Sequence, residues 1–143
     1  MTEVSFHSKV PEILGYTCRL LRKAMRKGSR VAVTGERDLL GQLDRALWSF
    51  EPLDFVPHVR LAAGARPEPR LQATPIWLVD ESANAPVNEV LVNLGPGIAS
   101  GFESYQRVVE IVGREPASVQ AGRARWRHYT ERGYAIAHHE VGA

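Results

Sequence analysis

Arg30-Val-Ala-Val-Thr34 is a compact apolar run that ends at Gly35, a pattern typical of a buried β-strand. Helical patterns flank this run on both sides. Before it, apolar residues recur at helical spacing within Pro11 to Lys27, and Gly28 follows as a C-cap. After it, Glu36 to Trp48 carries a leucine stripe and is predicted to form a second helix. A buried strand between two amphipathic helices is typical of an α/β fold.

The same alternation continues along the chain. Further strands are predicted at Val4–His7, in Ile76-Trp-Leu-Val79, at Val90–Leu94 and at Tyr134–Val141. A third helix is predicted at Phe102–Val112, and a fourth from Pro116 to Arg132, where proline suits the first turn. We therefore expect a mainly parallel sheet with helices on both faces. The 143 residues are expected to form one domain, residues 1–143.

Composition excludes several classes of protein. Apolar residues make up 44% and charged residues 24%, close to the averages for globular chains, so disorder is excluded as the main state. No apolar run approaches the ~18–20 residues that cross a bilayer, and the N-terminus lacks the pattern of a secretion signal. The single cysteine, Cys18, cannot form an internal disulfide. We expect a cytoplasmic location and no membrane partner.

The net charge is small, and arginine far outnumbers lysine among the cationic residues. Eighteen Lys and Arg oppose sixteen Asp and Glu, a net charge of +2 that is small for a protein whose main task is neutralising phosphates. Only Lys9, Lys23 and Lys27 are lysines, so fifteen of the cations are arginines. Arginine suits bidentate contacts with carboxylates or phosphates, although an arginine-rich codon usage would give the same excess without any function.

Enzyme and cofactor motifs are absent from the sequence. Gly95 to Gly101 has the spacing G-x-G-x-x-x-G, one residue longer than a dinucleotide fingerprint, and Pro96 removes an N–H where an anion would bind. His138 and His139 are adjacent and would point to opposite faces of a strand, so they cannot chelate one metal. Cys18 lies on the apolar stripe of its helix and reads as a buried thiol. We expect no catalytic, cofactor-binding or metal-binding residues.

Two features of the sequence are not explained by core packing alone. The first is an aromatic segment within Leu43–His58, which places Trp48 and Phe50 at a helix end and Phe55 in the following loop. These aromatics either cap the core or anchor a partner, and the sequence leaves both interpretations open.

The second feature is the helix Pro116–Arg132, whose stripe of Val119, Gly122, Trp126 and Tyr129 has Arg123 and Arg127 along its edge. Arg125 is expected to point elsewhere, about 160° from Arg123, as an exposed arginine whose substitution leaves the fold intact. One interpretation is a solvated basic face near a helix C-terminus. The other is an apolar groove flanked by two guanidiniums, which suits an acidic peptide with an aromatic end or a nucleic-acid strand.

These two features, in this order, resemble the chi subunit family of bacterial DNA polymerase III. The resemblance is carried by Leu43-Asp-x-x-Leu-Trp48, Phe55-Val-Pro-His58, Val90–Leu94, Arg107–Val112 and Arg123-x-Arg-Trp-Arg-x-Tyr129-x-x-x-Gly-Tyr134, and it covers nearly the whole chain. It implies a Rossmann-like fold and a non-enzymatic accessory of the clamp loader that works in a nucleoid-associated replisome.

The resemblance also implies partners and sites. It implies a monomer that forms a heterodimer with the psi subunit, through a surface that includes Trp48 and Phe55. It further implies binding of the acidic C-terminal tail of single-stranded DNA-binding protein, at the end of the third helix and in the fourth helix, by Val112, Arg123, Trp126 and Arg127. Tryptophan at position 126 replaces the tyrosine common in the family. DNA would then be reached only indirectly.

The alternative is a module that binds nucleic acid directly. It would use the same Arg/Trp helix together with the basic residues of the first helix, which are Arg19, Arg22, Lys23, Arg26 and Lys27. That first helix also fits an ordinary amphipathic helix with a solvated basic face.

Overall fold

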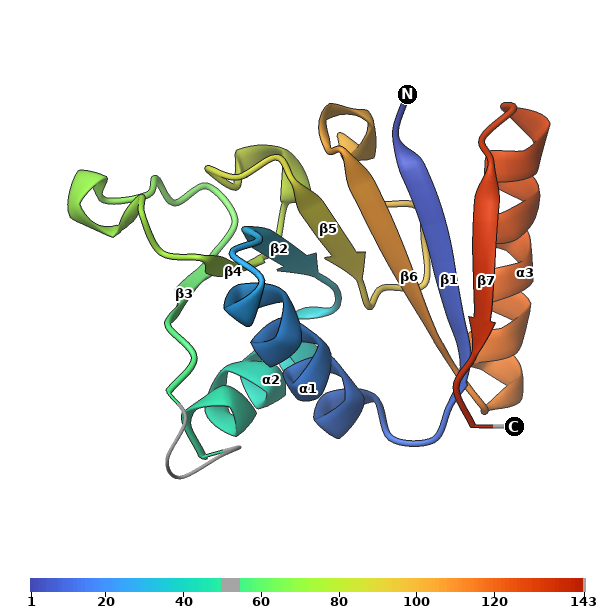
Figure 1. Cartoon of the computed structure of the whole chain (residues 1–143), viewed down its shortest axis with the longest axis horizontal. Helices are drawn as coiled ribbons and strands as arrows, with labels where there is room; N and C mark the ends of the chain where they lie inside the picture. Colours follow the sequence, from blue (N-terminus) through green and yellow to red (C-terminus); the bar gives the residue numbers. More distant parts are fainter. Residues whose placement is uncertain (50–54, 143) are drawn as a thin grey trace.

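The described residues, 1–49 and 55–142 of a computed structural model, form one seven-stranded sheet in which every strand pair is parallel. The strand order is β3-β4-β2-β5-β6-β1-β7 (Figure 1). The strands are β1 (Glu3–Val10), β2 (Val31–Thr34), β3 (His58–Leu61), β4 (Ile76–Val79), β5 (Val90–Asn93), β6 (Arg107–Gly113) and β7 (Ile136–Glu140). The predicted α/β class with a mainly parallel sheet is confirmed.

Helices cover both faces of this sheet, as predicted. The helices α1 (Ile13–Arg26) and α2 (Arg37–Ser49) lie side by side, whereas α3 (Pro116–Glu131) packs behind β6 and β7 (Figure 1). Single 3-10 turns at Pro69–Leu71, Ser82–Asn84 and Phe102–Ser104 complete the connections. Pro116 occupies the first turn of α3, where its missing N–H disrupts no helical hydrogen bond.

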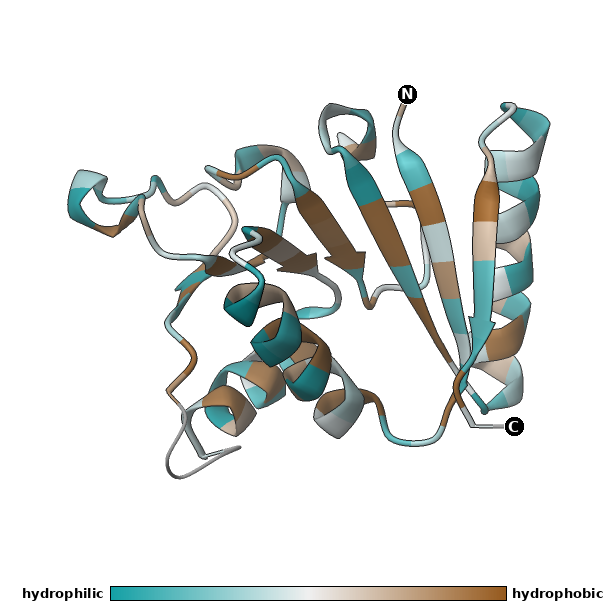
Figure 2. Ribbon diagram, in the orientation of Figure 1, coloured by the Kyte–Doolittle hydropathy of each residue, from teal (hydrophilic) through white to brown (hydrophobic). Residues whose placement is uncertain are grey.

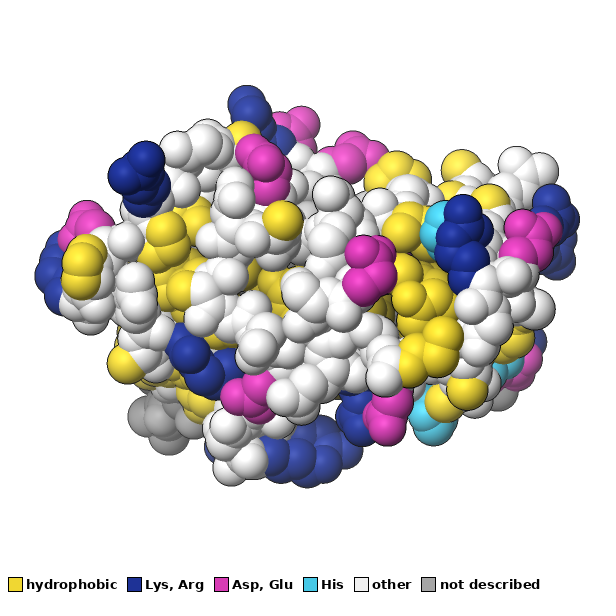
Figure 3. Space-filling model, turned by 90° about the horizontal axis from the view of Figure 1, so that it is seen from above, with side chains coloured by type: hydrophobic (Ala, Val, Ile, Leu, Met, Phe, Trp, Pro, Cys, Tyr) yellow, Lys and Arg dark blue, Asp and Glu magenta, His cyan; other side chains and the backbone are white. Residues whose placement is uncertain are grey.

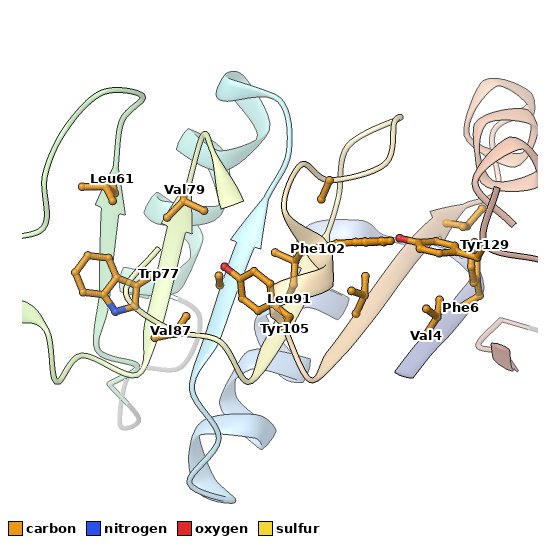
Figure 4. Packing of buried hydrophobic residues seen from close by; sticks show 14 residues of the cluster. Val4, Phe6, Leu61, Trp77, Val79, Val87, Leu91, Phe102, Tyr105 and Tyr129 are labelled. Atoms are coloured by element: carbon orange, nitrogen blue, oxygen red, sulfur yellow. The ribbon is translucent and has the colours of Figure 1, made fainter. Parts of the chain in front are cut away.

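Two apolar clusters fill the space between the sheet and its two coverings. Leucines of α1 and α2 pack on one face with Cys18, which is 1% exposed, and burial raises the pKa of its thiol to about 11. On the other face, Phe6 of β1 and Tyr129 of α3 pack with Phe102 and Tyr105 (Figure 4). Hydrophobic residues dominate the central strands (Figure 2), as expected for strands that are covered on both sides.

The predicted helix at Phe102–Val112 is wrong. After one 3-10 turn, the chain enters β6, a central strand that pairs with both β5 and β1. The spacing of Phe102, Tyr105, Val109 and Val112 happens to match a helix. However, a strand buried on both faces has no alternation of its own, so periodicity cannot distinguish it from a helix. The β-branched residues of the segment favour the strand.

The expectation that Arg125 is exposed is also wrong. Arg125 is 3% exposed, and its Nε donates to Oε1 of Glu110 on β6 at 2.8 Å, while its Nη1 donates to the carbonyl oxygen of Pro96 at 2.8 Å. Glu110 is completely buried, and it also accepts hydrogen bonds from Tyr129 Oη (2.6 Å) and Asn93 Nδ2 (3.0 Å). A buried carboxylate requires such partners, so an arginine must face inward on α3.

The charge state of this network follows from two opposing effects. Burial raises the pKa of the Glu110 carboxyl, whereas the Arg125 guanidinium and the three hydrogen bonds favour the ionised form. All groups that contact the carboxyl oxygens are donors, so the geometry matches an ionised acceptor. Burial also raises the pKa of the Tyr129 hydroxyl, so Tyr129 remains a donor.

Breaking this ion pair should destabilise the fold. We expect Arg125→Met to lower the free energy of unfolding by about 3–5 kcal/mol, because it leaves Glu110 buried without its cation. The double variant Arg125→Met/Glu110→Gln should recover part of that loss, because a neutral amide is cheaper to bury. Urea unfolding monitored by circular dichroism measures both values.

The matched control is Arg132→Met, which removes an exposed arginine just after α3. It should change stability by no more than about 0.5 kcal/mol. An Arg125→Met variant as stable as this control would contradict the role of the ion pair.

Candidate functional site

A groove of about 930 Å³ runs between α3 and the strands β1 and β7. We call it the α3–β7 groove and define it by three parts. Its floor consists of Phe6, Val112 and Gly122, its wall is Trp126, and its rim carries Arg123 and Arg127. The four residues predicted to act together, Val112, Arg123, Trp126 and Arg127, thus line one groove.

The floor and wall of the groove are apolar. Phe6 and Val112 are 3% and 6% exposed, and the Phe6 ring lies 5.0 Å from the Trp126 ring. Trp126 keeps 37% of its surface exposed, so it offers an open aromatic face. Gly122 brings the helix close to the sheet, since a Cβ on it would lie 3.0 Å from Cγ2 of Val112. Val112 belongs to β6 and not to the end of a helix as expected.

The rim of the groove carries unpaired cations. Arg123 and Arg127 are exposed, and within the described part of the chain neither forms a hydrogen bond or an ion pair. They lie four residues apart, hence on one side of α3, while Arg125 between them turns inward to Glu110. Their guanidiniums remain available to an anionic ligand, for which arginine offers paired donors.

Strand β7 supplies the opposite side of the groove. The His138 ring packs edge-on to Trp126 at 5.4 Å, and its Nε2 is hydrogen-bonded to Ser8 Oγ at 2.7 Å. Near the end of the groove, Lys9 and Glu140 form an ion pair at 3.2 Å. The sequence pattern of α3 alone gives no indication that His138 lines the groove. The signal for it is the parallel register that sets His138 beside Phe6, and this register becomes visible only once β1 and β7 are paired.

A second candidate surface lies at the other edge of the sheet, near β3. Trp48 and Phe55 are 62% and 57% exposed, and their rings lie 5.3 Å apart. The rings do not fill the core, so the interpretation as core caps is wrong for these two residues. Phe50 lies outside the described residues.

The Trp48 ring packs against the ring of His58. The two rings are 4.9 Å apart, and the His58 nitrogens contact the Val56 carbonyl oxygen at 2.7 Å and Asp44 Oδ1 at 2.9 Å. Trp48 of α2 and Phe55 therefore form an exposed aromatic surface that packs on His58 through Trp48.

The glycine loop after β5 forms a turn. Asn93 Oδ1 accepts from the Gly95 amide at 3.0 Å, and Asn93 Nδ2 donates to the Gly97 carbonyl oxygen at 2.8 Å. The cavity beside this loop, about 310 Å³, is also lined by Glu36 and Glu81, which would repel a phosphate, and by Asp80, which is paired with Arg37 and Arg60. The loop thus uses its polar groups internally.

Neither a metal-binding cluster nor a membrane-spanning helix is found in the described residues. In residues 1–49 and 55–142, no three His, Cys, Asp or Glu side chains are grouped as a metal site would require. None of the helices described is long and apolar enough to span a bilayer.

Known proteins resemble this chain along most of its length. Residues 1–137 match the family model of the DNA polymerase III chi subunit, HolC. A curated relative from Pseudomonas aeruginosa, the DNA polymerase III subunit chi, is 32% identical over 99% of this chain and 98% of its own length. The protein of the same name from Escherichia coli is 27% identical over 83% of this chain and 79% of its own length.

Proposed function

The chain belongs to the DNA polymerase III chi subunit family, an accessory family of DNA replication and not a family of enzymes, and from that premise we propose a linking role for it. As a single domain, it joins the psi subunit of the clamp loader to the acidic C-terminal tail of single-stranded DNA-binding protein. It acts in the bacterial cytoplasm, within the nucleoid-associated replisome, and it forms a heterodimer with psi.

The observation that carries the tail assignment is the pair of unpartnered arginines beside an apolar groove. A tail that ends in phenylalanine requires an apolar surface for its ring, and Val112 and Trp126 provide one. Its α-carboxylate and the preceding aspartates require cations, and Arg123 and Arg127 are placed to supply them. Trp126 keeps the aromatic wall without the hydroxyl of tyrosine, so the tail is held here without that hydroxyl.

The psi assignment rests on Trp48 and Phe55. Aromatic residues are enriched at the centres of protein interfaces, and these two exposed rings lie together, 5.3 Å apart. They lie near β3, whereas the α3–β7 groove lies at β7, the opposite edge strand of the sheet. Two separate surfaces allow one chain to hold both partners at once.

The small net charge favours a protein ligand over nucleic acid. Cationic and anionic side chains are interspersed on the face seen in Figure 3, and the net charge is only +2. A direct DNA-binding module is the alternative, and it predicts a continuous basic surface.

The first test compares the two ligands directly. We expect this chain to bind an acidic peptide ending in phenylalanine and to bind single-stranded oligonucleotides poorly. Fluorescence anisotropy over a salt series measures both affinities, and peptide affinity should fall less steeply with salt because part of it is apolar. Tight oligonucleotide binding with a steep salt slope, and no peptide binding, would establish the alternative.

Reversing one charge on the groove rim should prevent binding of the tail peptide. We expect Arg123→Glu to abolish detectable peptide binding, since a lost charged hydrogen bond costs about 1.5–3 kcal/mol and like-charge repulsion adds to it. The matched control is Arg132→Glu, an exposed arginine outside the groove, which should cost far less. Arg125→Glu is unsuitable as a control because Arg125 is buried. Equal losses from positions 123 and 132 would reveal only a diffuse basic field.

The psi surface has a complementary test. Trp48→Ala and Phe55→Ala should each weaken association with psi and leave peptide affinity unchanged, because neither side chain lines the groove. Their melting temperatures should stay near that of the parent, since both rings are largely exposed. Arg123→Glu should show the reverse pattern, with psi binding intact. Unchanged psi binding by both aromatic variants would refute the assignment.

A further inference from the structure

His138 occupies a position in the α3–β7 groove that the proposed function does not use. Its ring is exposed and stands edge-on to Trp126, the wall against which an aromatic ligand side chain would pack. Ser8 fixes the ring through Nε2. Within the described residues no hydrogen bond reaches Nδ1, so this nitrogen remains available to a ligand.

We propose that His138 is a ligand-binding residue of the α3–β7 groove, which contacts a carboxylate of the acidic peptide and adds a positive charge to the groove when it is protonated. The proposal rests on the tail binding proposed above. A phenylalanine packed against Trp126 carries its carboxylate within one side-chain length of its ring. His138, Arg123 and Arg127 all line the groove that would hold this carboxylate.

The charges around His138 explain why its own charge matters. From β1, Lys9 lines the groove, but Glu140 of β7 is paired with it at 3.2 Å. From α3, Arg123 and Arg127 contribute two cations and Glu131 one anion, and Arg114, which directly follows β6, contributes a further cation. The β7 side of the groove thus holds a neutralised pair and His138. Histidine is the side chain whose unperturbed charge changes between about pH 5 and pH 8, so it is the residue type that makes peptide binding depend on pH in this range.

The test measures peptide affinity at about pH 6 and about pH 8. The probe is an acidic peptide ending in phenylalanine, and the readout is its fluorescence anisotropy with the full chain. We expect the parent protein to bind about two- to fivefold more tightly at the lower pH, the range for one exposed ion pair. His138→Gln should lose this pH dependence, and His138→Lys should bind at both pH values as tightly as the parent does at the lower one.

The matched control is His139→Gln. Residue 139 is the next residue of β7, and its side chain lies on the other face of the sheet, where its ring contacts His7 at 5.3 Å. This variant should keep the full pH dependence of the parent. Melting curves at both pH values establish that all variants are folded.

The possible outcomes distinguish the role of His138 from tail binding itself. Parent binding that is independent of pH, or pH dependence that survives in His138→Gln, would overturn the role of His138 and leave tail binding intact. Loss of pH dependence in His139→Gln but not in His138→Gln would overturn it as well. A parent protein that binds no peptide at either pH would overturn tail binding and, with it, the role of His138.

Discussion

The ion pair between Glu110 and Arg125 fixes how α3 sits on the sheet, and most of the functional geometry depends on that placement. Glu110 is fully buried on the central strand β6, so it requires donors from whatever covers it. Arg125 and Tyr129 of α3 supply two of them, and Asn93 of β5 supplies a third. One carboxylate therefore determines which side of α3 faces inward.

This orientation divides the arginines of α3 between structure and binding. With Arg125 committed to Glu110, Arg123 and Arg127 lie on the flank of the helix, beside Trp126. Gly122 lets the same helix approach Val112 closely, and the space left between α3, β1 and β7 is the groove. The ion pair also reaches Pro96 in the loop after β5, so helix, strand and loop are held together. Along this part of α3, Arg125 stabilises the fold, whereas Arg123 and Arg127 remain available to a ligand.

The two candidate surfaces lie near opposite edge strands, β3 and β7, and this separation has a physical basis. In a parallel sheet covered on both faces, the faces of the central strands are inaccessible, and the exposed surfaces lie on the helices, at the strand ends and near the edge strands. The aromatic surface uses α2 and the chain before β3, whereas the groove uses α3 and β7. Each surface contains residues absent from the other, so substitutions can address one at a time.

The sequence by itself determined the α/β class, the helices α1, α2 and α3 to within a few residues, and the residues that flank the groove, because amphipathic periodicity and the i, i+4 spacing of Arg123 and Arg127 are local properties. Only the tertiary structure decided that Phe102–Val112 contains a strand, that Arg125 is buried and that His138 faces Trp126. A strand buried on both faces has no distinguishing period, and an arginine faces inward only because a carboxylate 15 residues earlier in the chain is buried beneath it. His138 reaches the groove through the register of β7 on β1, which joins residues about 130 positions apart and leaves no mark on either segment alone.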